Sequence, residues 1–390
     1  MNPGDRVRRV TGGQVLARQG WVEGDLAILR DGIESLGGGA APRPADGVLD
    51  AAGAMVVPGF LDLQINGGFG FDLTSAPQSV WALGERLPAT GVTAFLPTLV
   101  SGPLEGIDRA LEVLAAGPPE GYLGARPLGW HLEGPMLSPS RRGAHEARWL
   151  RSPGLDVIEG WRPESGVRMV TLAPELDGAT PVVEELVARG VVVSIGHSDA
   201  AFERAAAAFD SGARAGTHLF NAMSGLHHRA PGVVGAILAR DDVVAGLIVD
   251  GVHVHPAVVT STWRLKGPGG VALVTDAVAP MGAGSGGGRL GTSTIEVSGS
   301  EVRGPDGTLS GSTLTLDRAV RNVTEFAGAA VEDAIAAATS TPAALAGETR
   351  RGRIEPGAIA DLVLLDRDLE VAATIVAGRL AYERGTRTPS

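Results

Sequence analysis

The sequence predicts an α/β protein: a (β/α)₈ TIM-like barrel with a small β-sandwich domain built from both termini. Three patterns predict this class. Short runs rich in Val, Ile and Leu recur through the middle of the chain, helical stretches separate them, and both ends show a different, alternating pattern. A length of 390 residues is too long for one small core and fits one large barrel plus a minor domain.

Eight apolar runs are the candidate barrel strands. In chain order they are MVVPGFLDLQI (55–65), VTAFLPT (92–98), LGWHLEG (128–134), VRMVTLAP (167–174), VVVSIGH (191–197), ARAGTHL (213–219), VAGLIVD (244–250) and VALVTDA (271–277). Stretches with helical spacing lie between them, such as PVVEELVARG and AAFERAAAAFD. Buried strands that alternate with helices favour a parallel barrel. A doubly wound sheet alternates similarly, but no Gly-x-Gly-x-x-Gly follows an early strand.

The two ends of the chain differ from the middle. They contain short alternating segments with Gly and Asp turns, such as GDLAILRDGIESLG near the start and GRIEPGAIADLVLLD near the end. Neither end has enough apolar residues to fold alone. We therefore expect residues 1–57 and 350–390 to form one small β-sandwich, and residues 58–349 to form the barrel. A strand-like segment near 286–311 predicts a β-hairpin inserted after the eighth barrel strand.

Composition excludes several classes of function. The net charge of −11 argues against a nucleic-acid or anionic-membrane partner. The chain has no cysteine, which excludes disulfides, thiolate metal sites and a cysteine nucleophile. No apolar run is long enough to cross a bilayer, and the first residues lack the apolar core of a signal peptide, so we expect a cytoplasmic protein.

The chain has a single lysine, Lys266, which we place in a polar turn after a helix. A P-loop is therefore excluded, because no glycine-rich loop ends in Gly-Lys. A Schiff-base aldolase is disfavoured, and a carboxylated lysine bridging two metals has no candidate on a strand.

Polar residues gather where the predicted strands end. Glu133, His197, His218 and Asp276 each close one of the apolar runs. In a barrel of this kind, strand ends meet at one face, where the chemistry takes place. One oxygen and two imidazole nitrogens, from Glu133, His197 and His218, suit a catalytic zinc ion or a similar divalent ion, with water as the fourth ligand.

Two residues at the end of the first predicted barrel strand indicate how many metal ions the site binds. One large class of metal hydrolases has a His-x-His pair at this place, whereas this chain has Gln64 and Asn66. Neutral amides are poorer ligands than imidazole for a divalent transition metal. We therefore expect a single metal site, with Gln64 as a hydrogen-bonding residue beside it.

Eight motifs, in this order, also carry a family resemblance. They are PGFLDLQING, HLEGP, GHSDA, THLFNAM, VDGVHV, VTDA, GSTLTLDRAV and GRIEPGAIADLVLLD. Together they resemble the N-acetylglucosamine-6-phosphate deacetylase family of the amidohydrolase superfamily, over roughly residues 50–365. The resemblance implies a hydrolase that removes the acetyl group from N-acetylglucosamine 6-phosphate, giving glucosamine 6-phosphate and acetate. It also implies a homodimer and one divalent metal per subunit: Zn²⁺ first, with Fe²⁺, Co²⁺ and Mn²⁺ as alternatives.

The resemblance assigns roles to individual residues. Asp276 is the general base for water and then the general acid for the departing amine, and His253 donates a hydrogen bond to the carbonyl oxygen. Arg229, with His228 as a helper, is expected to bind the phosphate in a neighbouring subunit's site. The remaining expected substrate contacts are Gln64, His145, Asn221, Ala222, Leu314 and His253 itself.

Two alternatives remain open at this point. The nearer is another amidohydrolase, such as a deacetylase for the galactosamine epimer or a cyclic amidase. The farther is a non-catalytic sugar-phosphate sensor on the same barrel. A sensor could lose Asp276 or a metal ligand without harm, yet all of these residues are present.

Overall fold

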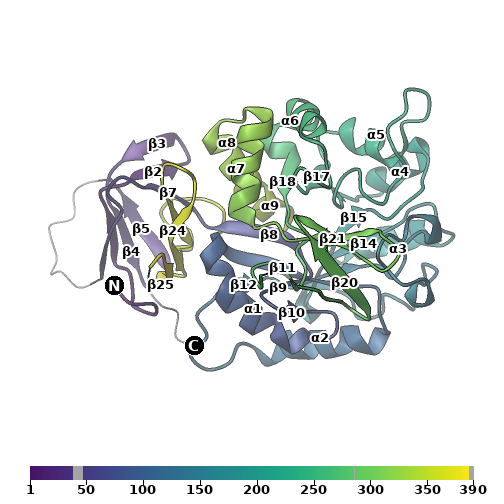
Figure 1. The fold of residues 1–390 in the computed structure, drawn as a ribbon, viewed down its shortest axis with the longest axis horizontal. Coiled ribbons are helices and arrows are strands. Elements are labelled where there is room, and N and C mark those ends of the chain that lie inside the picture. Colours follow the sequence, from purple (N-terminus) through teal and green to yellow (C-terminus); the bar gives the residue numbers. More distant parts are fainter. Residues whose placement is uncertain (38–46, 285, 386–390) are drawn as a thin grey trace.

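The computed structural model describes residues 1–37, 47–284 and 286–385. The predicted domain ranges also include residues 38–46, 285 and 386–390, which lie outside the described residues. Figure 1 shows the two expected units beside each other, a β-sandwich at one end and a larger β/α barrel at the other. The predicted fold class is confirmed.

Eight parallel strands form the barrel: β8 (Phe60–Ile65), β11 (Val92–Val100), β13 (Trp130–Glu133), β14 (Val167–Leu172), β15 (Val192–Ile195), β16 (Ala215–Gly216), β17 (Val244–Leu247) and β18 (Val271–Leu273). Each pairs in parallel with the next in this order. Their residues are almost all buried, which explains the unbroken apolar runs in the sequence. Between β8 and β18 the barrel closes by a single bridge, Ile65 to Ala277, and by backbone hydrogen bonds around it.

Helices surround this barrel: α1 (Val80–Arg86), α2 (Leu104–Ala116), α3 (Ala179–Ala188), α4 (Phe202–Asp210), α5 (Gly232–Leu238), α6 (Pro256–Gly270), α7 (Leu316–Ala327), α8 (Val331–Ala338) and α9 (Ser340–Leu345). Helix α7 shows why they form. Its buried residues Leu316, Ala319, Val320 and Val323 recur at helical spacing, so one stripe faces the core. Shorter elements complete the unit: β9 (Gly67–Gly68), β10 (Phe71–Asp72), β12 (Arg126–Pro127), and the 3₁₀ turns η1 (Pro77–Ser79), η2 (Leu87–Thr90), η3 (Pro139–Arg141), η4 (Ala147–Trp149) and η5 (Pro163–Ser165).

Both ends of the chain build the β-sandwich. One sheet has the order β5-β4-β1-β6 and the other β25-β24-β23-β7-β2-β3. The strands are β1 (Arg9–Thr11), β2 (Gln14–Ala17), β3 (Gly20–Glu23), β4 (Leu26–Leu29), β5 (Gly32–Leu36), β6 (Val48–Asp50), β7 (Met55–Pro58), β23 (Leu362–Leu365), β24 (Val371–Val376) and β25 (Arg379–Glu383). Leu26 and Ile375 belong to one shared apolar cluster, so neither end buries its apolar face alone.

The segment after the eighth barrel strand forms more than the expected hairpin. It folds into four antiparallel strands, β19 (Gly288–Leu290), β20 (Ser293–Ser298), β21 (Glu301–Arg303) and β22 (Leu309–Ser312). Val278, Leu290, Ile295 and Val302 give this insert a small core of its own. In Figure 1, β20 and β21 lie in front of the barrel.

Lys266 lies on helix α6 and not in the turn expected from the sequence. Its ammonium donates hydrogen bonds to the backbone carbonyls of Ile237, Arg240 and Val243, where α5 ends and β17 begins. A helix C-terminus is the negative end of the helix dipole, so the cation stabilises it. The single lysine is therefore a structural cap. Among the described residues, no helix is both long and apolar enough to span a bilayer.

Candidate functional site

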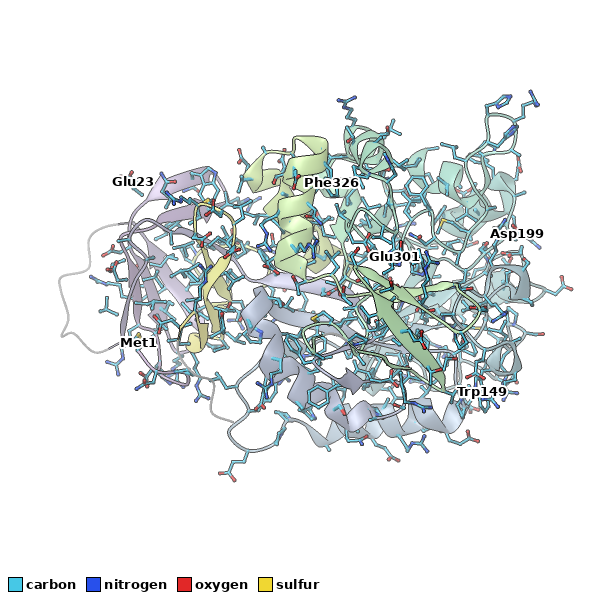
Figure 2. All side chains as sticks on the ribbon, viewed as in Figure 1. Met1, Glu23, Trp149, Asp199, Glu301 and Phe326 are labelled. Carbon is cyan, nitrogen blue, oxygen red and sulfur yellow. The ribbon has the colours of Figure 1, made fainter. Side chains whose placement is uncertain are left out.

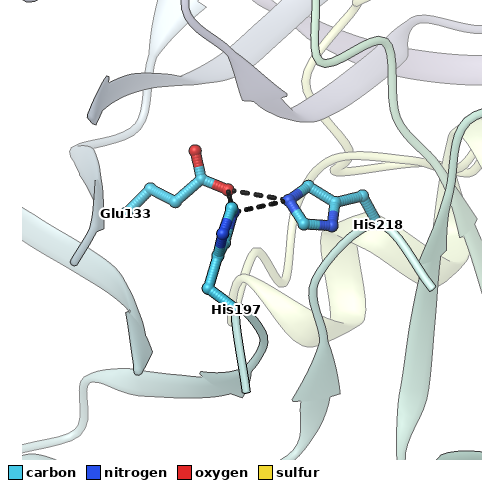
Figure 3. A group of neighbouring side chains, drawn as sticks. All are labelled: Glu133, His197 and His218. Carbon is cyan, nitrogen blue, oxygen red and sulfur yellow. Dashed lines mark hydrogen bonds and ion pairs between the residues drawn. The ribbon is translucent and has the colours of Figure 1, made fainter. Parts of the chain in front are cut away.

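Three expected metal ligands converge at the C-terminal ends of the barrel strands. Glu133 is the last residue of β13, and His197 and His218 each lie two residues beyond a strand. Glu133 Oε1 lies 3.0 Å from His218 Nε2 and 3.3 Å from His197 Nε2, and the two Nε2 atoms are 3.0 Å apart. Figure 3 shows the carboxylate and both imidazoles turned toward one point. Their candidate ligand atoms all lie within 4.8 Å of one another.

The chemistry of this donor set fits a divalent cation. Two imidazole nitrogens and one carboxylate oxygen are a common catalytic zinc set, which leaves a coordination position for water or substrate. Burial, and then nearby His145, lower the pKa of His197, which keeps its ring neutral and able to bind a metal. Burial alone would raise the pKa of Glu133, but the adjacent side chains of His145, His197 and His218 hold it well below its usual range. Glu133 is therefore an anion facing two nitrogen donors.

The backbone at these positions is strained. His197, His218 and Asp276 have φ angles of 50°, 30° and 48°, in the left-handed region that residues with a side chain rarely adopt. Each such residue costs on the order of 1–3 kcal/mol and persists only where the surrounding structure holds it. Strain at three neighbouring strand ends is typical of a functional site. It turns the side chains inward just past the point where each strand stops.

His197 is oriented from its other side. Its Nδ1 lies 2.9 Å from the backbone carbonyl of Arg141, which can only accept, so Nδ1 carries the hydrogen and Nε2 is left for the metal. The Arg141 guanidinium in turn donates to Asp199 at 2.8 Å. His145 is fixed similarly: its Nδ1 accepts from the backbone of Ser101, and its Nε2 lies 3.6 Å from Glu133 Oε2.

The amides on the first strand act as donors to carboxylates. Gln64 Nε2 lies 2.8 Å from Glu133 Oε1 and 3.2 Å from Asp276 Oδ1, and Asn66 Nδ2 lies 2.6 Å from the same Asp276 oxygen. The first strand of this chain thus carries two amides that hold Glu133 and Asp276 together. Burial, followed by the charge of Glu133, raises the pKa of Asp276 to about 6. This suits a group that accepts and returns a proton near neutral pH.

His253 has a carboxylate partner that the sequence reading missed. Its Nδ1 lies 2.6 Å from Asp250 Oδ2, and the other oxygen of Asp250 accepts from the backbone of Val252 and His253. Burial would raise the pKa of Asp250, but these hydrogen bonds from His253 and the backbone hold it below its usual value. Asp250 therefore stays ionised and orients the ring. Both residues lie in the motif VDGVHV. Their separation of three residues is that of a tight turn, and this spacing could have indicated that Asp250 bonds His253.

A pocket of about 410 Å³ opens above the cluster. Its lining includes Asn66, Glu133, His145, His197, His218, Asn221, Ala222, His253 and Asp276, which brings together most of the predicted site. Gln64 lies just beneath, bonded to Glu133. The insert supplies one wall with Leu290, Arg303 and Leu309. A larger hollow of about 680 Å³ lies beside Ala279, Pro280 and Gly288, but it contains none of these chemical groups.

Three predicted substrate contacts lie away from this pocket in the single chain. His228 and Arg229 are exposed in a loop, where Arg229 Nη1 lies 2.7 Å from His228 Nε2, and Leu314 is buried and does not line the pocket. The pocket's arginines are instead Arg141 and Arg303, each bonded to a carboxylate of its own. The partner of Arg303 is Glu301, labelled in Figure 2 on the insert in front of the barrel.

His131 is a buried histidine that the sequence reading left without a role. Burial lowers the pKa of His131 to about 4, so its ring is neutral at pH 7. Its Nδ1 lies 3.1 Å from the carbonyl of Leu63 and must carry the hydrogen, so its Nε2 accepts from the Thr171 hydroxyl at 2.7 Å. Two residues before Glu133 on the same strand, His131 lies one layer below the metal ligands.

A parallel barrel with these ligands and a separate buried aspartate at its rim defines a class, the metal-dependent barrel hydrolases. Comparisons with known proteins agree. The model of the amidohydrolase family matches residues 55–381. N-acetylglucosamine-6-phosphate deacetylase from Rattus norvegicus is 40% identical, over 96% of this chain and 94% of its own length.

Solved structures give the same result. N-acetylglucosamine-6-phosphate deacetylase from Pasteurella multocida superposes with a TM-score of 0.89 at 29% identity, covering 95% of this chain and 98% of that one. A variant of the Mycobacterium smegmatis enzyme, in complex with N-acetyl-D-glucosamine-6-phosphate, superposes with a TM-score of 0.87 at 36% identity, covering 97% and 100%. The chain therefore belongs to the amidohydrolase family and, within it, to the N-acetylglucosamine-6-phosphate deacetylases.

Proposed function

We propose that this chain hydrolyses the acetyl amide of N-acetylglucosamine 6-phosphate, releasing acetate and glucosamine 6-phosphate. One observation carries the proposal: Glu133, His197, His218 and Asp276 meet in one pocket at the barrel rim, in a chain whose relatives bear this activity's name over nearly their whole length. The sensor alternative loses support, because the acid–base group and its orienting amides are all in place.

We assign one divalent ion per chain to Glu133, His197 and His218. The oxygen and nitrogen donors favour Zn²⁺, and Fe²⁺, Co²⁺ and Mn²⁺ suit the same set. When bound, the ion supplies Lewis-acid chemistry, acidifying water and polarising the acetyl carbonyl. The carboxylate pairing of Gln64 and Asn66 supports one ion rather than two, because both amides present N–H groups toward Glu133 and Asp276.

Asp276 and His253 provide the acid–base and hydrogen-bonding steps. Asp276 accepts the proton of the attacking water and then gives it to the departing nitrogen, which leaves as a neutral amino group. His253 donates a hydrogen bond to the acetyl oxygen as negative charge develops on it. Asp250 keeps the ring in position, since its carboxylate accepts from His253 Nδ1, and the ring protonated on both nitrogens then donates to the substrate from Nε2.

The phosphate is assigned to Arg229 of a second subunit, with His228 as helper. Two facts support an external cation: Arg229 is exposed on a projecting loop, and the pocket's own Arg141 and Arg303 are already paired with Asp199 and Glu301. A guanidinium binds phosphate oxygens bidentately. Within the same chain, His145, Asn221 and Ala222, which line the pocket, are assigned to the sugar.

The test couples metal analysis to product release. Purified protein should contain about one divalent ion per chain and should release acetate from N-acetylglucosamine 6-phosphate, and chelation should abolish the activity. The galactosamine epimer is assayed in parallel. Faster turnover of the epimer would reassign the substrate, and acetate release from neither sugar would overturn the proposed function.

A further inference from the structure

A belt of buried polar groups crosses the barrel interior one layer below the site. Such layers are ordinarily filled by branched apolar side chains. Here the His131 ring is followed by three hydroxyls, on Thr171, Thr217 and Ser194. The oxygens of Thr171 and Thr217 are 2.7 Å apart, and those of Thr217 and Ser194 are 2.6 Å apart. All four residues are at most 3% exposed.

The belt continues across the seam where the barrel closes. On β8, the Leu63 carbonyl accepts from His131, and the neighbouring Asp62 carboxylate accepts from the Thr275 hydroxyl at 2.5 Å. The other Asp62 oxygen accepts from the backbone of Gln64 at 3.2 Å and of Thr275 at 3.3 Å. The seam has only one ladder bridge, so this carboxylate supplies bonding that the ladder there lacks.

Apart from Thr171, the belt residues on the strands that carry the site precede a functional residue by one to three positions. Thr217 and Thr275 come just before His218 and Asp276, Leu63 before Gln64, His131 two residues before Glu133, and Ser194 three before His197. Three of these functional residues have left-handed backbone, which persists only if neighbouring structure fixes it. Buried polar groups are costly unless fully bonded, and the belt is bonded along its length.

We propose that this belt is a positioning layer, which fixes the strand ends so that Glu133, His197, His218 and Asp276 converge before substrate or ion arrives. It acts through the residues of the site and touches no reacting atom. The proposal rests on the metal site assigned above.

Thr171 gives the sharpest test. It lies on β14, which carries no assigned site residue, and its side chain does not line the pocket. Thr171→Val keeps the shape but removes the hydroxyl that joins His131 to Thr217, whereas Thr171→Ser keeps the hydroxyl. Zn²⁺ affinity is measured on the folded protein by chelator competition, and the melting temperature is measured on the metal-free protein.

Thr171→Val should bind Zn²⁺ up to about 10-fold more weakly, because Thr171 lies one bond further from the ion than the direct partners of ligands, whose loss costs roughly 10- to 100-fold. Thr171→Ser should bind like the parent protein. Unchanged affinity in Thr171→Val, or equal losses in both variants, would overturn the proposal. If Thr171→Val fails to fold, Ser194→Ala removes only the last hydroxyl of the belt and should give a smaller loss of affinity, and no loss there overturns the proposal too.

A second pair of variants separates positioning from general destabilisation. Thr275 precedes Asp276, which is not a ligand, so Thr275→Val should lower kcat roughly 10-fold with Zn²⁺ affinity and KM retained, and Thr275→Ser should restore kcat. If the belt only supports the fold, both Val variants should instead have a lower melting temperature. Zn²⁺ affinity and kcat should then not be affected separately in Thr171→Val and Thr275→Val. His197→Ala checks the underlying site: if it retains tight Zn²⁺, the site assignment fails, whatever the belt variants show.

Discussion

At the scale of single residues, the pair Gln64 and Asn66 decides how the site works. The N–H groups of these two side-chain amides on the first strand donate to Glu133 and Asp276. The sequence predicted the ligand triad because strand ends of a parallel barrel meet at one face. It could not reveal the partner of each amide, since that depends on atoms more than 60 residues apart.

Asp276→Asn is the first prediction at this scale. Asn keeps the size and most hydrogen bonds but cannot accept the proton of water. We expect kcat to fall roughly 10²-fold or more, with metal content and substrate binding retained. Steady-state kinetics on metal-analysed protein is the measurement. Near-normal turnover would place the general base elsewhere.

Asp276 should also determine how kcat depends on pH. Asp276 acts as a base only when ionised, and burial with the charge of Glu133 raises its pKa to about 6 in the metal-free protein. A nearby divalent ion adds positive charge, which lowers that pKa. Activity should therefore be lost as pH falls through a value no higher than about 6. A kcat profile with its acidic limb above pH 7 contradicts this assignment.

His197→Ala is expected to remove the metal. The side chain lies at the barrel rim and not in the apolar core, so the fold should survive while metal content and activity fall together. Elemental analysis and circular dichroism on the same sample give the answer. Two tightly held ions per active parent chain would show that the single-site reading of the first strand is wrong.

At the scale of elements, the apolar sequence pattern predicted the strands correctly where both faces of a strand are buried. The barrel strands are visible as apolar runs because both faces are covered, although β16 shrinks to Ala215–Gly216. The insert was expected as a hairpin but has four strands. Its Gly-rich turns are closely spaced and its core is only a few side chains, so the sequence pattern did not separate the individual strands. Lys266 was placed in a turn because Gly267 and Pro268 follow it, whereas it ends a helical stretch that is interrupted at Gly267, where φ is 61° and ψ is −177°.

The seam between β8 and β18 yields a stability prediction. Burial raises the pKa of Asp62 from 3.8 to about 7. Between about pH 4 and pH 7 the folded state keeps a proton that the unfolded chain has released, so the free energy of unfolding falls as pH rises through this window. Asp62→Asn lacks this proton. From pH 5 to pH 8 its stability relative to the parent should therefore increase, by roughly 1–4 kcal/mol.

Urea unfolding of the metal-free proteins at both pH values measures that difference. Asp108→Asn, at an exposed position on α2, is the matched control for loss of one carboxylate. If Asp62→Asn and the parent differ equally at pH 5 and pH 8, then Asp62 does not hold a proton in the folded state.

At the scale of the whole molecule, the two-unit architecture followed from chain length and from the contrast between middle and ends. The sandwich needs strands from both termini, because neither end has enough apolar residues for a core. The boundaries at residues 57/58 and 349/350, like the cytoplasmic location, stay predictions. The proposed phosphate contact of Arg229 stays a prediction too, because Arg229 lies outside the pocket of its own chain.

Arg229→Ala tests the assembly. A charge-assisted hydrogen bond contributes about 1.5–3 kcal/mol, so binding of the phosphorylated substrate should weaken roughly 10- to 100-fold. Turnover of the unphosphorylated sugar should barely change. Comparable losses on both substrates would mean that Arg229 supports the fold or the dimer instead.

Mixed dimers locate the arginine. Arg229→Ala chains are combined with Asp276→Asn chains. If Arg229 serves the partner's pocket, one site of each mixed dimer lacks both groups and the other has both, so part of the activity should return. No recovery in confirmed mixed dimers places Arg229 in the pocket of its own chain.

Because Lys266 is the only lysine, cleavage after it can be used to measure local unfolding around helices α5 and α6. A lysine-specific protease has one place to cut in 390 residues, the bond between Lys266 and Gly267. That bond lies at the kink of α6, and Lys266 is anchored to the end of α5 by three carbonyls. A protease needs an extended segment, so cleavage requires this corner of the barrel to unfold first. The rate of a single cut then measures how often α5 and α6 separate, without any label.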